Sequence, residues 1–200
     1  MTILSILKHH GYNVERSVLP TGRIIFPTAP ASSSAAFATA MSVKPHAFHG
    51  GGNPVEQVLD SSRTWWTDEA VLERDRQAMA RYFPGFVEVA DTQNPPPAWV
   101  GTLDTGYGVF TVRIQHRADH GLPHVTPAKP KARRRGRRTL ASPHTFINGN
   151  VCVAAQEDWD PEKDTTATVV GWAAHWHAAY VEWLFTDKWP MEGYEHRAAA

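Results

Sequence analysis

The amino-acid sequence predicts an α+β fold in which a helix is followed by a four-stranded antiparallel meander and then by a long second helix. Two segments, residues 67–83 and 166–186, repeat apolar residues at helical spacing. Between them lie four short runs rich in β-branched and aromatic residues, separated by turn residues. The connections are too short for the crossovers that parallel strands need. A chain of 200 residues can hold one such domain and some additional chain.

The first helix is expected to span about residues 66–83. Thr67 is the predicted N-cap, and the acidic side chains of Asp68 and Glu69 suit the positive end of the helix dipole. Pro84-Gly85 ends the helix. The apolar residues that form its stripe are Val71, Leu72, Ala78, Met79, Tyr82 and Phe83.

The meander is expected to consist of four short strands. Asp104-Thr105-Gly106 is a typical turn sequence and lies between the second and the third strand. The predicted strands are residues 86–90, 98–103, 107–114 and 122–126.

The last helix is expected over residues 166–186, with Thr165 or Thr166 as its N-cap. Three indoles fall on one face of this helix, which predicts that the face packs on the sheet as core. The residues of that face are Val169, Trp172, Trp176, Ala179 and Trp183.

Residues 1–62 differ in composition from the rest and predict a flexible N-terminal extension before a domain of residues 63–200. Residues 27–54 are dominated by small residues, proline and glycine without a sustained period. Within the first 26 residues, a short helix (Ile3 to His9) and a short strand (Arg23 to Phe26) are the expected elements. The extension is expected to be dispensable for function.

The charge is balanced, with 20 basic and 20 acidic residues, but it is unevenly distributed. Residues 129–138, KPKARRRGRR, hold seven of the basic side chains, so the remaining chain is acidic. This run is either a solvated loop or an electrostatic contact with a partner protein or a nucleic acid. No aromatic residue interleaves it, which argues against a base-stacking site.

Several classes of protein are excluded by simple counts. The apolar stretches are too short to span a membrane, and the start of the chain lacks the features of a secretory signal, which favours a cytoplasmic location. One cysteine excludes an internal disulfide and a multi-cysteine zinc site. His175 and His177 do not share a helix face and cannot chelate together. We therefore expect neither a metal nor a cofactor.

The single cysteine, Cys152, lies in the sequence Asn-Gly-Asn-Val-Cys-Val. In an extended segment, Val151 and Val153 point opposite to its side chain. A thiol is the strongest intrinsic nucleophile of a protein, with an ordinary pKa of about 8.5. We expect its sulfur to be partly exposed in a shallow groove.

From the first helix onward, the order of motifs resembles bacterial ubiquitin-conjugating enzymes (E2, UBC fold). Relatives of this kind occur in antiviral defence operons of the CBASS type and in ubiquitin-like operons. The motifs are Phe83-Pro84-Gly85-Phe86, Trp99-Val100-Gly101, Tyr107–Ile114, Leu122-Pro123-His124-Val125, His144, Asn148-Gly149-Asn150-Val151-Cys152-Val153, Trp159-Asp160-Pro161, Trp189-Pro190 and Glu195-His196.

The resemblance implies roles for individual residues. Cys152 would carry a thioester, and His144 would brace the active-site loop rather than act as a base. Eukaryotic E2 enzymes have His-Pro-Asn before the cysteine, whereas this chain has Pro143-His144-Thr145. Asn148 or Asn150 could replace the missing asparagine. Asp160, like Asp158, could orient the incoming amine or serve only as a turn residue.

The resemblance also implies an activity and partners. The chain would accept the C-terminal acyl group of a ubiquitin-like protein, or of a CBASS nucleotidyltransferase, from an E1-like activating enzyme. It would pass the group to an amine of a target protein. Two alternatives are a catalytically weak module that only binds a ubiquitin-like partner, and a nucleic-acid-binding protein that uses residues 129–138. No membrane partner is expected, and a nucleic acid is the less favoured partner.

Overall fold

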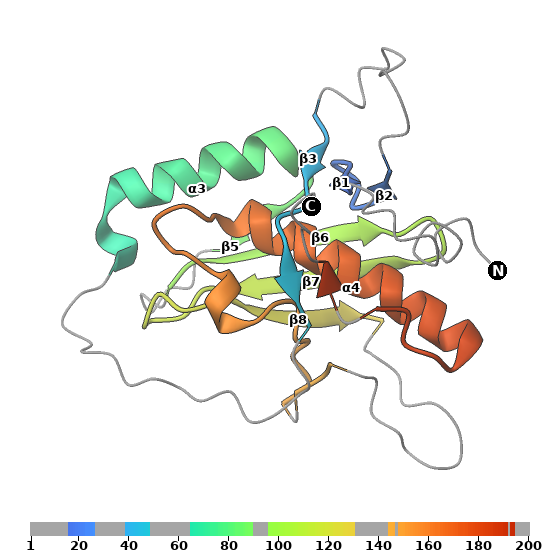
Figure 1. The fold of residues 1–200 in the computed structure, drawn as a ribbon. Coiled ribbons are helices and arrows are strands. Elements are labelled where there is room, and N and C mark those ends of the chain that lie inside the picture. The colour runs from blue at the N-terminus through green and yellow to red at the C-terminus, as the bar shows by residue number, and fades with distance from the viewer. Residues whose placement is uncertain are drawn as a thin grey trace, which may run out of the picture.

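A computed structural model describes residues 16–26, 39–48, 65–89, 96–130, 144–146, 148–191 and 193–194. Within these residues the fold is α+β, with two α-helices and antiparallel sheets (Figure 1). The α+β class predicted from the sequence is therefore confirmed. In the same residues, no helix combines the length with the apolar character needed to cross a bilayer.

The central sheet has four antiparallel strands in sequential order. Each strand pairs with the next one along the chain, as the short connections require. At the turn between the second and the third strand, the Asp104 carboxylate accepts a hydrogen bond from the Gly106 N–H. Gly106 has a φ of +84°, a conformation that favours glycine. The strands are β5 (Val87–Val89), β6 (Ala98–Asp104), β7 (Val109–Gln115) and β8 (His124–Lys129).

The long helix α4 (Thr166–Thr186) runs across one face of this sheet (Figure 1). Its bounds are those predicted, and Thr165 is its N-cap. Trp172, Trp176 and Trp183 are at most 7% exposed, which confirms that the three indoles are core. Replacing one such indole by alanine would cost about 3–5 kcal/mol of stability.

The helix α3 (Glu69–Tyr82) begins one residue later than its expected cap implies. Its N-cap is Asp68, whose carboxylate accepts a hydrogen bond from the Ala70 N–H over 3.0 Å. Thr67 instead ends a 3₁₀ turn, η1 (Trp65–Thr67). Asp and Thr are both good caps, so local sequence alone does not choose between neighbours.

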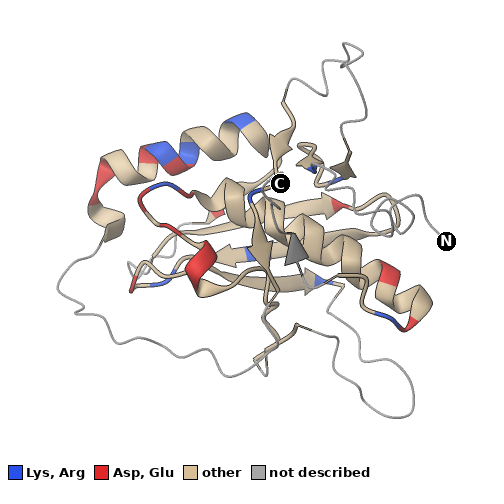
Figure 2. Ribbon diagram, in the orientation of Figure 1, with Lys and Arg blue, Asp and Glu red and all other residues tan. Residues whose placement is uncertain are grey.

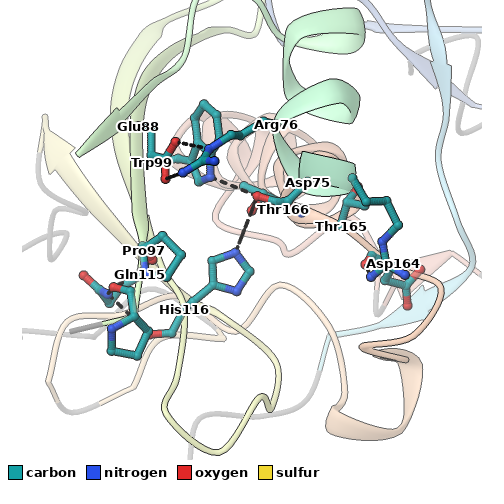
Figure 3. Close-up of polar contacts among 12 residues, drawn as sticks. Asp75, Arg76, Glu88, Pro97, Trp99, Gln115, His116, Asp164, Thr165 and Thr166 are labelled. Atoms are coloured by element: carbon teal, nitrogen blue, oxygen red, sulfur yellow. Dashed lines mark hydrogen bonds and ion pairs between the residues drawn. The ribbon is translucent and has the colours of Figure 1, made fainter. Parts of the chain in front are cut away.

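A buried carboxylate joins α3 to the start of α4 (Figure 3). Asp75 accepts hydrogen bonds from Trp99 Nε1 (3.0 Å), from the Thr166 N–H (2.6 Å) and from the Thr166 hydroxyl (2.9 Å). His116 Nε2 lies 2.8 Å from the same hydroxyl oxygen. Burial alone would raise the pKa of Asp75, but His116 and the hydrogen bonds from Thr166 outweigh it and the pKa is lowered. This network fixes the N-terminus of α4.

Parts of residues 1–62 pack against α4, unlike the flexible extension that composition predicts. Val18, Val43 and Phe48 are at most 3% exposed and belong to the core. The short strands of this region are β1 (Ser17–Val18), β2 (Ile24–Ile25), β3 (Met41–Ser42) and β4 (His46–Ala47), the last pairing with β9 (Gly193–Tyr194).

The physical reason lies in α4 itself. The helix is buried on almost every side, and residues 166–181 carry no Lys, Arg, Asp or Glu (Figure 2). A helix that is apolar all round needs cover on the face turned away from the sheet. Residues 39–48, here called the strap, supply part of that cover. The strand expected near residues 23–26 is present as β2, whereas the helix expected over residues 3–9 lies outside the described residues.

Candidate active site

Cys152 lies in an extended segment that adds to the open side of β8. Val151 forms antiparallel bridges with Val125 on one side and with Thr145 on the other. The Cys152 N–H donates a hydrogen bond to the His144 carbonyl over 2.8 Å. The cysteine is therefore held by backbone hydrogen bonds rather than on a loose loop.

A cavity of about 460 Å³ lies beside this segment, and Cys152 is part of its wall. Its walls come from the β7–β8 connection, from the start of β8 and from the residues that follow the cysteine. The lining residues are Arg117, Asp119, His120, Gly121, Leu122, Pro123, His124, Phe146, Val151, Cys152, Val153, Ala154, Ala155, Gln156, Glu157, Trp159 and Pro161. None of the three α4 indoles is among them.

Cys152 is only 3% exposed, so the expectation of a partly exposed sulfur is wrong. Its Sγ lies 3.6 Å from the Ala154 carbonyl oxygen, to which the thiol donates. Val151 and Val153, which point to the opposite face, are at most 2% exposed as well, so this segment is covered on both faces and not on one as the sequence predicts. Cys152 nevertheless lines the cavity.

His144 supports the cysteine through its backbone, while its ring lies elsewhere. The ring centroid is 5.6 Å from that of Phe48 and 5.0 Å from that of Trp189. The residue has a φ of +54°, which turns the chain into the segment that pairs with Val151. His144 is not among the residues that line the cavity.

Asn148 and Asn150 form the tight turn before the cysteine. The Asn148 carbonyl oxygen Oδ1 accepts from the Asn150 N–H (3.0 Å), and Asn150 Oδ1 accepts from the Thr126 hydroxyl (2.6 Å). Gly149 between them has a φ of +87°. Neither asparagine lines the cavity; their side chains brace the turn itself and tie it to Thr126 of β8.

Asp158 and Asp160 make structural contacts away from the cavity. Asp158 accepts from the N–H groups of Ala155 and Ala47, at 3.0 and 2.8 Å. Asp160 pairs with Lys163 at 2.6 Å, and this hydrogen bond is the main cause that lowers the pKa of Asp160. Neither aspartate lines the cavity.

The strap fastens the segment that follows the cysteine. The Lys44 ammonium donates to the Asp158 carbonyl oxygen (2.7 Å) and to the Asp164 carboxylate (2.5 Å). On its other side, the Lys44 carbonyl accepts from Trp172 Nε1 over 3.0 Å. The short turn η2 (Gln156–Asp158) is thus tied both to the strap and to α4, and Figure 2 shows it as an acidic stretch.

Two histidines, one in the strap and one in the cavity wall, are held in the neutral form. Burial lowers the pKa of His46 and of His120 to about 4, and the neighbouring His116 adds to the effect at His120. The His120 ring stacks on the Trp65 ring, with 4.2 Å between their centroids. His46 Nε2 lies within hydrogen-bond distance of His175 Nδ1, at 3.0 Å. In the described part of the chain, no cluster of three or more His, Cys, Asp or Glu side chains could hold a metal ion.

His124 lines the cavity, although the sequence alone predicts no catalytic role for it. Its nearness to Cys152 follows from the pairing of β8 with the cysteine segment. That pairing can be recognised only once the strand register is known. The basic run of residues 129–138, which the sequence singles out, lies mostly outside the described residues. Only Lys129 and Pro130 of this run are described.

A comparison with protein families finds one match relevant to this geometry. The family model described as "Type II CBASS E2 protein" matches residues 75–197, which include the second half of α3, the meander, the cavity and α4. No curated protein and no solved structure matches the chain.

Proposed function

This chain belongs to the Type II CBASS E2 protein family, and from that premise we propose that it is a conjugating enzyme of antiviral defence. Cys152 accepts an acyl group from an E1-like enzyme as a thioester and transfers it to an amine. The acyl donor is the C-terminus of a ubiquitin-like protein or of a CBASS nucleotidyltransferase. The amine belongs to a target protein.

The observation that carries this proposal is the position of the only thiol of the chain. Cys152 is part of the wall of a cavity of about 460 Å³, within the region that the family model matches. Gln156 and Glu157 at the rim of this cavity are exposed, so a donor can enter from that side. An extended C-terminal tail is narrow enough to approach a recessed sulfur, whereas a folded surface is not.

The chemistry consists of two acyl transfers. In the first, the Cys152 sulfur forms a bond to the acyl carbon, the bond to the E1 sulfur breaks, and the proton of Cys152 ends on the E1 thiol. In the second, an amine nitrogen attacks the Cys152 thioester, the carbon–sulfur bond breaks, and the thiol is regenerated. In the first transfer, the acyl group moves between two thiols that are similar leaving groups, so the exchange needs no cofactor.

A donor for the oxyanion of these steps is available in the cavity wall. Gln156 is the lining residue with a side-chain amide, and its Oε1 accepts from the Leu122 N–H over 3.2 Å. This contact orients the amide and leaves its NH₂ group to donate. We assign the oxyanion role to Gln156 because it lines the cavity, whereas Asn148 and Asn150 do not.

The 3% exposure of Cys152 favours a second candidate, a module that binds a ubiquitin-like partner without forming a thioester. In that case, the cysteine would be a packing residue, as most buried free cysteines are. The two functions differ in one observable, a covalent adduct on the chain.

The test mixes the purified chain with an E1-like enzyme of a Type II CBASS system, ATP and a tagged acyl donor. Intact-mass spectrometry should detect an adduct of donor mass minus water, lost on treatment with dithiothreitol. The matched control is Cys152→Ala, which should give no adduct. Tight binding of the donor without any adduct on the unmodified chain would favour the binding module.

A further inference from the structure

The strand register places one imidazole directly opposite Cys152. The Val151 N–H donates to the Val125 carbonyl over 2.8 Å, so Val125 and Val151 are a hydrogen-bonded pair of an antiparallel ladder. Stepping one residue along both strands brings His124 opposite Cys152. In such a ladder the next pair is a non-hydrogen-bonded pair, whose Cα atoms are about 4.5 Å apart and whose side chains approach most closely.

His124 and Cys152 also share the cavity described above. His124 and Cys152 line one cavity, as cross-strand neighbours on the same face of a ladder do. His124 begins β8, which fixes its backbone, and its Nε2 atom is buried. The imidazole is thus held on a strand at the wall of the cavity.

From this juxtaposition we propose that His124 is a catalytic residue that accepts the proton of Cys152, an inference that rests on the thioester function proposed above. In the exchange, the Cys152 S–H proton moves to the imidazole of His124 as the sulfur attacks the acyl carbon. The imidazolium then returns this proton to the leaving thiolate. Atoms and charge balance without a further reactant.

The other histidines near the cysteine fit this role less well. His144 lies across the opposite edge of the segment, and its ring packs on Phe48 and Trp189 rather than in the cavity. His120 lines the cavity, but its ring is stacked on Trp65. Neither has a register position opposite Cys152 on the cavity side.

The remaining titratable groups of the cavity set the electrostatic surroundings. They are Arg117, Asp119, His120 and Glu157, of which His120 is neutral at pH 7 because burial lowers its pKa to about 4. Arg117 and Asp119 form an ion pair, with Nε 2.8 Å from Oδ1, and largely neutralise each other. An imidazolium at His124 would therefore act on the thiolate chiefly as its nearest positive charge.

The test uses the single cysteine of the full chain, because the rate of alkylation by iodoacetamide under native conditions then reports on Cys152 alone. The rate is measured from pH 5.5 to 9.5 in the unmodified chain and in His124→Gln. An opposite charge next to an acid lowers its pKa by about one unit or more. We therefore expect the variant to react about tenfold more slowly near pH 7 and to converge with the unmodified chain at pH 9.5.

Two results would overturn the proposal. One is an unchanged pH profile in His124→Gln, and the other is a shift that appears in His144→Gln instead. Should the variant fail to fold, His124→Asn is measured in its place, and the unmodified chain alone remains informative. A folded chain whose profile has the same midpoint as the urea-unfolded chain would contradict a proton acceptor next to the thiol.

The outcome separates this inference from the function on which it rests. If the alkylation profile shifts but no thioester forms, the His124–Cys152 pair stands and the conjugating function fails. If the thioester forms equally fast at pH 7 in the unmodified chain and in His124→Gln, the function stands and the role of His124 fails.

Discussion

Lys44 and Asp158 are 114 residues apart in the sequence, yet the Lys44 ammonium donates a hydrogen bond to the Asp158 carbonyl over 2.7 Å. The same ammonium pairs with Asp164, whose side chain is 7% exposed. The strap is therefore a structural part of the candidate active site, because it holds the turn that follows Cys152. This relationship leads to the first prediction.

Replacing Lys44 by methionine should lower the free energy of unfolding by about 1–3 kcal/mol, because the Lys44 hydrogen bonds are lost and the buried Asp164 carboxylate loses its counter-ion. Thioester formation should slow as the turn after Cys152 loosens. Urea denaturation and the adduct assay measure the two effects. The control is Lys188→Met, an exposed lysine. Equal stability of the two variants would show that the strap contact is unimportant.

Removing residues 1–48 should prevent cooperative folding, because it uncovers the outer face of α4. Val18, Val43 and Phe48 would leave the core together. A milder variant, Phe48→Ala, should lower the free energy of unfolding by about 3–5 kcal/mol. Thermal unfolding followed by circular dichroism measures both. A truncated chain that melts as cooperatively as the full chain would restore the expectation that this region is dispensable.

Stability should fall as the pH is lowered from 6.5 toward 4. Burial lowers the pKa of His177 in the folded chain from the ordinary 6.5 to about 4. Between these values the unfolded chain binds a proton that the folded chain does not, so stability that is present above pH 6.5 is lost as the pH falls. His46 and His120 act in the same direction. His177→Gln should reduce the slope by up to about 1.4 kcal/mol per pH unit.

Urea titrations at pH 7, 6 and 5 give this slope directly. Since His177→Gln also changes packing, the decisive quantity is the difference in slope between the two chains and not their difference in stability at one pH. Parallel lines would mean that His177 is protonated equally in the folded and the unfolded chain.

Replacing Gln156 by alanine should slow thioester formation about tenfold or more while leaving the fold intact, because a donor to the oxyanion is lost from an exposed position. Gln156→Glu keeps the acceptor for the Leu122 N–H but removes the NH₂ donor, so it should be at least as slow. Single-turnover kinetics with a preloaded E1-like enzyme measure the rate. Full activity in Gln156→Glu would exclude the oxyanion role.

The sequence was a good guide to elements whose signals are local. The helix bounds of α4 and the order of the four strands follow from periodicity and turn residues, while the sequence narrows the α4 cap to Thr165 or Thr166 and the structure has Thr165. The choice of Asp68 over Thr67 as the α3 cap does not, because both residues can accept the first N–H groups of a helix.

The features that the sequence could not predict depend on contacts between distant segments. The strap is ordered because α4 is apolar on the face turned away from the sheet, and this need is not visible in the composition of residues 39–48. The burial of Cys152 and its position opposite His124 follow from a strand register set by Val125 and Val151. A single sequence does not specify that register.

The most direct test of the central claim, that Cys152 carries the acyl group, is a change in the chemistry of the adduct in Cys152→Ser. With the E1-like enzyme, ATP and the tagged donor, the unmodified chain should give an adduct that dithiothreitol removes. The serine variant should give either an oxyester that resists dithiothreitol and is cleaved by alkali, or no adduct. An adduct that resists dithiothreitol on the unmodified chain and forms equally on Cys152→Ala would contradict the account, because another side chain would then carry the acyl group.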